Sequence, residues 1–414
     1  MKRGRASVAL VGCFLALARP AAARTQTPAS ANALPADTAV PEQFRSLYRE
    51  LDATLRLAAQ AYPFNRGATR PLGVPYLFIS PTVLRSPASD SAAWRDLLAT
   101  LDAFKAMRME GVSVMIAAPF LTVGNPKALI DVYRRIAAEV HARSMKLYVE
   151  HFVSPPFSPY ALTGLRDDPQ GKKDFLDMME KEVSLIYTDV RPDYLSLVTE
   201  PETLRRWTRL SLSADEWAMW IGEVAAHLKS TNASPGTRLG AGAGTWEAEE
   251  FVLRFAQQAS LDYVDFHLYA LNLNGDDQLA RLSTLIHKVR EVRSSIAITV
   301  GEAWLYKHGA AEPKGMVNTD AFARDNFGFW APLDERFLRV LWGIAQKERI
   351  AVVVPYFSQF FFSYYTIGTV ESSQLPPWPA SVPASWDKAL ESIRKRQLSA
   401  TGKAIAAMLD DGKK

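Results

Sequence analysis

Several features that often define a function are scarce or missing in this sequence of 414 residues. Cys13 is the only cysteine, so the chain forms no internal disulfide and offers no thiolate cluster to a metal. There are six histidines and no H-E-x-x-H pattern, which argues against a zincin-type metal site. Neither a phosphate-binding G-x-x-x-x-G-K-[ST] loop nor a serine-hydrolase G-x-S-x-G turn is found. The sequence therefore predicts no metal and no cofactor.

Apolar runs long enough to span a membrane are also missing, since such a span takes about 20 apolar residues. The apolar stretch from Ala6 to Ala18 is too short. It follows a basic start and precedes Ala21-Ala22-Ala23, an order typical of a cleavable signal peptide. We therefore expect residues 1–23 to be removed and the protein to be exported to the periplasm or the extracellular space, with no membrane span.

A second interpretation of the N-terminus concerns Cys13. Leu10-Val11-Gly12-Cys13 fits a bacterial lipoprotein box, which would anchor the protein at a lipidated Cys13. The apolar run continues through Leu17, whereas a polar tether usually follows a lipid-bearing cysteine. Cleavage after Ala23 is therefore the favoured prediction.

The excess of positive charge belongs to the same segment. The formal charge of +4 comes from 48 basic and 44 acidic residues, and four of the basic ones are Lys2, Arg3, Arg5 and Arg19. The mature chain then carries equal numbers of both signs, so we expect no nucleic-acid partner. No pattern in the sequence indicates an oligomeric state.

The rest of the chain alternates between strand-like and helix-like patterns. Residues 24–41, rich in Ala, Pro, Thr and Ser, are expected to form a flexible tether. The pattern of residues 42–414 predicts eight strand–helix units. For six of them the strand itself is predicted, at Tyr76–Ser80, Val112–Pro119, Lys146–Phe152, Tyr194–Thr199, Ile296–Gly301 and Ile350–Tyr356. The fifth and sixth are predicted as whole units, Arg238–Ala259 and Tyr263–Val292. The helices with the clearest patterns are Glu42–Ala61, Ser91–Glu110, Pro126–Arg143, Lys172–Thr188, one beginning after Ser213, Asp334–Glu348 and Trp386–Met408.

This alternation predicts an α/β protein with a parallel sheet. Ala351-Val352-Val353-Val354 is apolar on both faces, as a strand covered by helices requires. Eight units without a break favour a closed (β/α)8 TIM barrel forming a single domain, and an open doubly wound sheet is the alternative.

Polar residues at the carboxyl ends of barrel strands are the candidates for chemistry. Glu200 follows the predicted fourth strand and Glu302 the seventh, so the two carboxyl groups should face each other across one barrel mouth. A reaction that needs an acid and a nucleophile on opposite sides of one bond suits this arrangement. Glycoside hydrolysis with retention is such a reaction, and it uses carboxyl groups about 5 Å apart.

Short motifs around these residues resemble clan A of the glycoside hydrolases. Leu197-Val198-Thr199-Glu200-Pro201 is similar to the strand-four motif of the clan, and Ile298-Thr299-Val300-Gly301-Glu302 to its strand-seven motif. The resemblance implies that Glu200 is the acid/base and Glu302 the nucleophile. Asp265-Phe266-His267-Leu268-Tyr269 resembles the strand-six end, which implies that His267 lines the subsite and Tyr269 hydrogen-bonds the nucleophile.

The sequence departs from the clan at one position. Clan members usually have Asn before the acid/base, where it contacts the sugar 2-hydroxyl, and this chain has Thr199. A threonine hydroxyl donates a hydrogen bond but reaches less far. Thr199 is therefore a substrate-binding candidate that puts the sugar preference, and activity itself, in question.

Less specific interpretations compete with these assignments. Glu202 lies in the first turn of a following helix, where an acidic residue suits the helix dipole, and it competes with Glu200. His151 fits a hydrogen-bonded core residue as well as a substrate contact, and alternation along a strand points Glu150 away from it. The glycines from Gly240 to Gly244 fit tight packing better than nucleotide binding, because their spacing is not G-x-G-x-x-G.

Aromatic side chains can stack on the apolar faces of sugar rings. Trp304, Trp330 and Tyr356 are the platform candidates, and Trp304 is the preferred one.

The sequence thus predicts an exported, retaining hydrolase of an oligosaccharide or polysaccharide with β linkages. A carbohydrate-binding barrel that has lost efficient catalysis is the alternative, which Thr199 motivates. A metal-dependent barrel hydrolase ranks third, because the strand ends carry few histidines.

Overall fold

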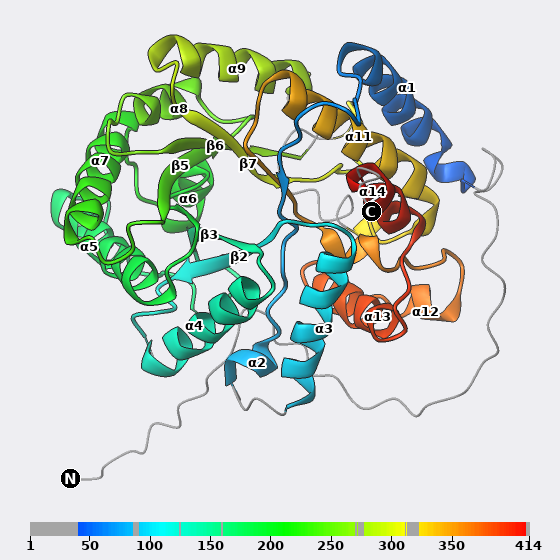
Figure 1. Cartoon of the computed structure of the whole chain (residues 1–414), viewed down its shortest axis with the longest axis horizontal. Helices are drawn as coiled ribbons and strands as arrows, with labels where there is room; N and C mark the ends of the chain where they lie inside the picture. Colours follow the sequence, from blue (N-terminus) through cyan, green and yellow to red (C-terminus); the bar gives the residue numbers. More distant parts are fainter. Residues whose placement is uncertain are drawn as a thin grey trace.

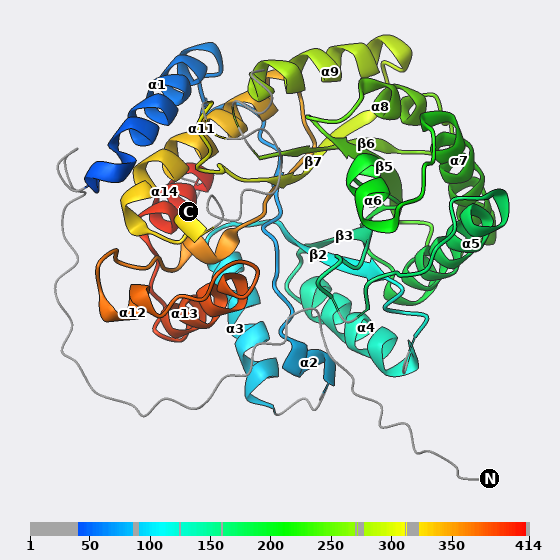
Figure 2. The ribbon, with the colours of Figure 1, turned by 180° about the vertical axis from the view of Figure 1, so that it is seen from behind.

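The computed structural model describes residues 40–85, 91–123, 126–158, 160–269, 271, 277–310, 312 and 323–410. A ring of strands lies at its centre, and helices surround the ring (Figures 1 and 2). The predicted signal peptide, the Cys13 motif and nearly all of the tether lie outside the described residues. Among the described residues, no helix is both long and apolar enough to span a membrane.

Eight strands form one sheet in which all neighbours are parallel, in the order β1-β8-β7-β6-β5-β4-β3-β2. Their bounds are β1 Leu72–Gly73, β2 Gly111–Ala118, β3 Lys146–Val153, β4 Tyr194–Ser196, β5 Arg238–Gly244, β6 Tyr263–Leu268, β7 Ala297–Ala303 and β8 Val352–Pro355. The segment after β1 closes the ring, since Leu77 N donates to Ser113 O at 2.7 Å and Ser113 N to Pro75 O at 2.9 Å. The predicted (β/α)8 barrel is confirmed, and the open sheet is excluded.

The helices that follow the strands form the outer layer. The longer ones are α1 Arg45–Ala61, α3 Ala92–Ala106, α4 Pro126–Ala142, α5 Pro169–Leu185, α7 Ala214–Thr231, α9 Gln278–Val292, α11 Ala331–Lys347, α13 Ser381–Arg394 and α14 Ala400–Leu409. The short α2 Pro81–Arg85, α6 Pro201–Thr208, α8 Glu249–Ala256 and α12 Val370–Ser373 complete the set. The helix predicted after Ser213 begins with a capping box, because the Ser213 hydroxyl accepts from Glu216 N and the Glu216 carboxylate accepts from Ser213 N.

Two predicted elements are wrong in place or extent, and one short helix was missed. The first strand is Leu72–Gly73, and in the predicted segment only Tyr76 makes a bridge, because Pro75 has no N–H to continue the ladder. The last helix is two helices, since Arg396 has a left-handed φ of 54° and Ser399 caps a new helix at Gly402 N. Helix α6 was not predicted, because eight residues are too few for a clear apolar period.

One layer of the barrel interior is filled by neutral side chains. Tyr148 lies 3.0 Å from Ser196 Oγ and 3.2 Å from Thr299 Oγ1, and Ser196 lies 3.0 Å from the Tyr263 hydroxyl. A Cβ on Gly240 would overlap the Tyr263 ring, so the glycines of β5 serve close packing, as predicted. We call Tyr148, Tyr194, Ser196, Tyr263 and Thr299 the neutral layer.

Candidate active site

Glu200 stands at the junction between β4 and α6. Its backbone is left-handed (φ 49°, ψ 62°), unusual for a residue with a Cβ, and Pro201 begins the helix directly after it. The turn aims the Glu200 carboxylate at the barrel axis, where Oε1 accepts a hydrogen bond from His267 Nδ1 at 2.8 Å. Glu200 lines the pocket at the barrel mouth and Glu202 does not, so the structure places the predicted candidate, not its competitor, in the mouth.

Glu302 lies within β7, which continues to Ala303, and not after the strand as predicted. The pairing of β7 shifts register on both sides, between Phe266 and His267 on β6 and between Val300 and Ala303 on its own strand. Such irregularities re-aim a side chain. Tyr269 donates a hydrogen bond to Glu302 Oε2, so the expected contact is present.

His267 lies between four carboxyl groups. Its Nδ1 is 2.8 Å from Glu200 Oε1 and 3.5 Å from Glu302 Oε2, and its Nε2 is 3.4 Å from Glu150 Oε1 and 3.5 Å from Asp265 Oδ2. Burial by itself lowers the pKa of His267, but the negative charges of Glu302 and Glu150 and the nearby Asp265 carboxylate raise that pKa well above its ordinary value. These carboxyl groups therefore favour the imidazolium form of His267. We call Glu150, Glu200, Asp265, His267 and Glu302 the charged layer.

The pKa values of two carboxyl groups in the charged layer are raised as well. Burial raises the pKa of Glu302 well above 4.5, and the charges of Glu150 and Glu200 add to this effect, although the His267 charge and the Tyr269 hydrogen bond oppose it. Burial also raises the pKa of Glu150. Strongly shifted pKa values of neighbouring buried groups are typical of sites that carry acid/base chemistry.

Three acidic residues of the site were not predicted. Asp265 accepts from Thr299 Oγ1 at 2.5 Å, and Glu150 points inward at His267. Glu247 accepts from Glu202 N at 2.9 Å and Thr203 N at 3.1 Å, which fixes the first turn of α6 beside Glu200. Burial and the Glu200 charge raise the pKa of Glu247 to about 8. Glu247 could have been predicted from its place just after β5, at the carboxyl end of a barrel strand.

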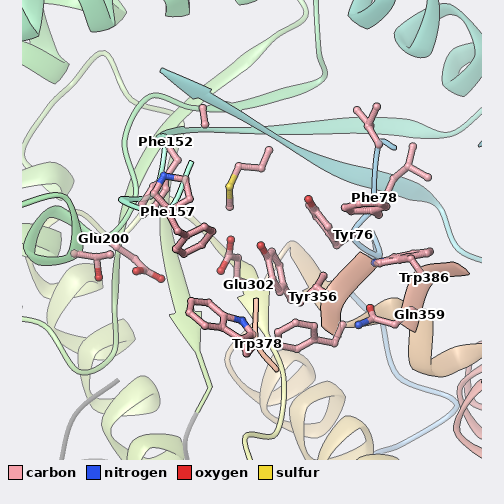
Figure 3. Close-up of a pocket in the computed structure, with 18 of the residues that line it drawn as sticks. Tyr76, Phe78, Phe152, Phe157, Glu200, Glu302, Tyr356, Gln359, Trp378 and Trp386 are labelled. Atoms are coloured by element: carbon pink, nitrogen blue, oxygen red, sulfur yellow. The ribbon is translucent and has the colours of Figure 1, made fainter. Parts of the chain in front are cut away.

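A pocket of about 290 Å³ opens above the charged layer (Figure 3). Glu200 and Glu302 both line it, together with the predicted Tyr269 and Tyr356. Most other lining side chains are apolar or aromatic, and they are Tyr76, Leu77, Phe78, Ile79, Pro81, Leu84, Met115, Ala117, Phe120, Tyr133, Phe152, Pro155, Phe157, Trp207, Tyr306, Phe357, Trp378, Val382 and Trp386. Thr203, Arg206 and Gln359 are the further polar ones.

The two predicted tryptophan platforms are wrong. Trp304 is fully buried and packs on Phe360 and Phe361 at ring-centroid distances of 5.7 and 6.1 Å, because the chain leaves β7 at Ala303 and turns into the apolar layer. Trp330 is also fully buried and stacks on Tyr48 of α1. Trp207, Trp378 and Trp386 line the pocket instead, on segments where no motif singled them out.

His151 and Thr199 are not in the pocket either. The side chain of His151 points into the helical layer, with Nε2 3.3 Å from Glu182 Oε2 and Nδ1 3.3 Å from Leu197 O, opposite to its neighbour Glu150. Thr199 is fully buried, and its hydroxyl has no hydrogen-bond partner among the described residues. His267 is buried below the pocket, so it contacts the two glutamates and not the pocket surface.

One group of side chains has the geometry to hold a metal ion. Donor atoms of Glu150, His267 and Glu302 lie within 4.8 Å of one another. A metal bound there would have to compete with protons for these three groups, because the pKa of each is raised. The charged layer is therefore where the predicted absence of a metal must be tested.

No protein-family profile matches the chain, and no curated protein matches its sequence. Among solved structures, it is similar to the exo-beta-1,4-mannosidase Op5Man5 from Opitutaceae bacterium strain TAV5, with a TM-score of 0.51 and 11% identity over 84% of this chain and 61% of that one. Virulence factor SghA, in complex with its substrate analog salicin, gives a TM-score of 0.50 and 10% identity over 86% of this chain and 98% of that one. Another structure of SghA names Agrobacterium tumefaciens as its source.

The likeness establishes the (β/α)8 fold. The resemblance to the barrels of clan A is thus confirmed at the level of the fold. This chain spans less than two thirds of the length of the mannosidase. The similarity between the two proteins is therefore a similarity of fold.

Proposed function

We propose that the protein is a retaining hydrolase of β-glycosides, with Glu302 as the nucleophile and Glu200 as the general acid/base. The spacing of the two carboxyl groups carries this proposal. Glu200 Oε1 lies 2.8 Å and Glu302 Oε2 3.5 Å from the same atom, His267 Nδ1, so these two oxygens are at most about 6.3 Å apart. Retaining enzymes hold these groups ~5 Å apart, whereas inverting enzymes leave roughly 6.5–9.5 Å for a water molecule.

The contacts around each glutamate suit two successive displacements. Glu302 attacks the anomeric carbon while Glu200 protonates the leaving oxygen, so the glycosidic bond breaks as an ester bond to Glu302 forms. Glu200 Oε1 is engaged with His267, which leaves Oε2 for the proton. Glu200 then takes a proton from water, and the water oxygen displaces Glu302. Neither step uses a metal or cofactor.

Export is the second part of the proposal. It rests on residues 1–23, whose basic start, apolar core and Ala21-Ala22-Ala23 are typical of a signal peptide. Deleting these residues is expected to leave the protein in the cytoplasm of its host, and N-terminal sequencing of the exported form should begin after Ala23. Export of the deleted form would contradict this part.

A substrate screen with matched variants tests the chemistry. The mature protein is assayed on a panel of β-linked polysaccharides and aryl β-glycosides, and proton NMR follows the first product formed. We expect the starting anomeric configuration, and a loss of roughly 10³-fold or more in kcat for Glu302→Gln. Glu202→Gln is the matched control, because Glu202 lies beside Glu200 but outside the pocket. An inverted first product would reject the nucleophile assignment.

Azide separates the roles of the two glutamates. In Glu302→Ala, azide can enter the vacated space and attack from that side, which yields a glycosyl azide of inverted configuration. In Glu200→Ala, azide can attack the ester on Glu302, which yields the retained configuration. The same product from both variants would contradict the assignment of one carboxylate to each side of the sugar.

The third-ranked hypothesis is tested on the same substrate. Activity that survives exhaustive EDTA treatment is expected. Loss of activity that a divalent cation restores would favour a metal-dependent hydrolase using Glu150, His267 and Glu302.

Two observations favour a second candidate function, a carbohydrate-binding barrel without efficient catalysis. The pKa of Glu302 is raised, which opposes an ionised nucleophile, and Thr199 lies too deep to reach a sugar hydroxyl. This candidate predicts binding to a glycan array, no product after long incubation, and unchanged binding by Glu200→Gln.

A further inference from the structure

The pocket is unusual in how few polar side chains it offers near Glu200. Helix α6 begins directly after Glu200 and presents Thr203, Arg206 and Trp207 to the pocket. Phe152 and Phe157 line the same pocket as Glu200 (Figure 3), and the Phe152 ring meets the Trp207 ring edge-on at 5.1 Å. We call Phe152, Phe157 and Trp207 the aromatic box.

The aromatic box lies on the side where the leaving group departs. In the proposed reaction Glu200 protonates the leaving oxygen, so the group attached to that oxygen must lie next to Glu200 and the pocket face of α6. Phe157 supports this location, because its side chain is 44% exposed although it borders the pocket, and it meets the Trp378 ring at 5.2 Å. Covering an exposed apolar side chain at a pocket edge with a ligand favours binding, because it removes apolar surface from water.

A second sugar is poorly matched to this box. A pyranose brings several hydroxyls, and each one buried without a partner costs about 1–3 kcal/mol. The polar side chains here are Thr203, whose hydroxyl already accepts from Arg206 at 2.7 Å, and Arg206 itself. A flat apolar ring needs no such partners and gains from edge-to-face contact with Phe152 and Trp207.

The size of the pocket points the same way. Its volume of about 290 Å³ lies at the lower end of the range of pockets for small molecules, about 300–1,000 Å³. Beyond Glu302 the walls are again aromatic, with Phe78 stacked on Trp386 at 5.8 Å. An extended groove for successive sugars would need polar partners along its length, and the labelled polar groups on that side are few, namely Gln359 and the hydroxyls of Tyr76 and Tyr356 (Figure 3).

We propose that the substrates are small β-glycosides whose leaving group is a flat hydrophobic alcohol of the phenol class, which the aromatic box receives. This inference rests on the proposed function, which places Glu200 at the leaving oxygen. Hydrolysis then adds water across the sugar–oxygen bond and releases a free sugar and a phenol, with the phenol proton supplied by Glu200.

Binding of uncleavable analogues tests this inference without relying on turnover. Calorimetry on the mature protein, residues 24–414, compares phenyl with methyl 1-thio-β-D-glycosides of glucose, galactose, mannose and xylose. Thio-linked disaccharides of the same sugars are measured alongside. We expect the phenyl compound of the preferred sugar to bind at least tenfold more tightly than its methyl partner and than the disaccharide.

Variants of Trp207 connect that preference to the aromatic box. Trp207→Leu is expected to reduce the phenyl-to-methyl ratio at least threefold, because it removes the ring edge that faces the leaving group. Trp207→Phe should keep most of the ratio, and circular dichroism checks that both variants fold. A preference that is unchanged in Trp207→Leu would overturn the assignment of the box.

The possible outcomes separate the two proposals. Equal affinity for phenyl, methyl and disaccharide compounds overturns this inference and leaves a hydrolase with another leaving group. Tight phenyl-selective binding, with no hydrolysis of any aryl glycoside, overturns the proposed function and keeps the pocket assignment.

Discussion

Two layers of side chains in the same barrel interior differ in how their polar groups are satisfied. Tyr148 and Glu150 both point inward from β3, and Tyr263 and Asp265 both point inward from β6, so two residues along a strand separate the layers. In the neutral layer, Tyr148, Ser196 and Tyr263 share hydrogen bonds of 3.0 Å. The lower layer is therefore a packed polar core with its hydroxyls paired.

The charged layer is built in the opposite way. Buried atoms of Glu150, Asp265 and His267 meet one another at 3.4–3.5 Å without forming hydrogen bonds of good geometry. Buried charges that are incompletely satisfied reduce stability, and proteins retain them where function requires them. The comparison teaches that stability is provided by the lower layer and chemistry by the upper one, and four substitutions can break or sharpen this division.

The largest effect is expected from Gly301→Ala. A Cβ at this position would overlap the carboxylate oxygens of both Asp265 and Glu150. Displacing two members of the charged layer beside Glu302 should lower kcat/KM at least 100-fold and the free energy of unfolding by about 1–3 kcal/mol. Substrate kinetics and urea denaturation measure these effects. Gly236→Ala is the matched control, because its Cβ meets no atom within 4 Å. Wild-type kinetics in Gly301→Ala would mean that the charged layer tolerates displacement.

Tyr269→Phe should change the pH dependence of catalysis. The Tyr269 hydrogen bond lowers the pKa of Glu302, which burial has raised, so its removal raises that pKa further. Activity requires ionised Glu302 and is lost as the pH falls through its pKa, so the acidic limb of kcat/KM should move to higher pH. A hydrogen bond to a charged group is worth about 1.5–3 kcal/mol, which corresponds to a shift of roughly 1–2 pH units.

A pH–rate profile measures this shift, and Tyr365→Phe is its control. Tyr365 donates to Ala384 O at 3.2 Å and lies outside the pocket, so its loss should leave the acidic limb in place. If the limb stays where it is in Tyr269→Phe as well, Glu302 is not the group that this limb reports.

Tyr148→Phe addresses the neutral layer. The substitution removes the hydrogen bonds of the Tyr148 hydroxyl to Ser196 and Thr299. Ser196 still has Tyr263 as a partner, and Thr299 still has Asp265. The free energy of unfolding should fall by about 1–2 kcal/mol, while kcat/KM changes less than threefold. Urea denaturation and substrate kinetics measure the two effects. A large catalytic loss with unchanged stability would reverse the division between the layers.

Thr199→Val should have the smallest effect. The Thr199 hydroxyl is buried and has no partner among the described residues, and valine has nearly the same shape. Stability should stay within about 1 kcal/mol or rise, and kcat/KM should stay within twofold. A tenfold loss of kcat/KM at unchanged stability would instead mean that Thr199 reaches the sugar when substrate binds.

Local patterns in the sequence were enough to predict the barrel. Apolar runs bounded by helical periods located five of the strands closely and the starts of β5 and β6, because period and burial are properties of neighbouring residues. The location of Glu200 and Glu302 at one barrel mouth could also be predicted, since parallel strands in a barrel place their carboxyl ends on the same side. The contact between Tyr269 and Glu302 came from the motif resemblance.

Tertiary structure decided what surrounds these glutamates. Register shifts on both sides of β7 turn Glu302 toward His267, and the next tryptophan, Trp304, is buried. Trp207 reaches the pocket because α6 begins directly after the left-handed Glu200, a geometry that no short motif predicts. The pKa of Glu302 also depends on Glu150, which is 152 positions earlier in the chain, because it follows from burial and from charges that only the closed barrel brings together.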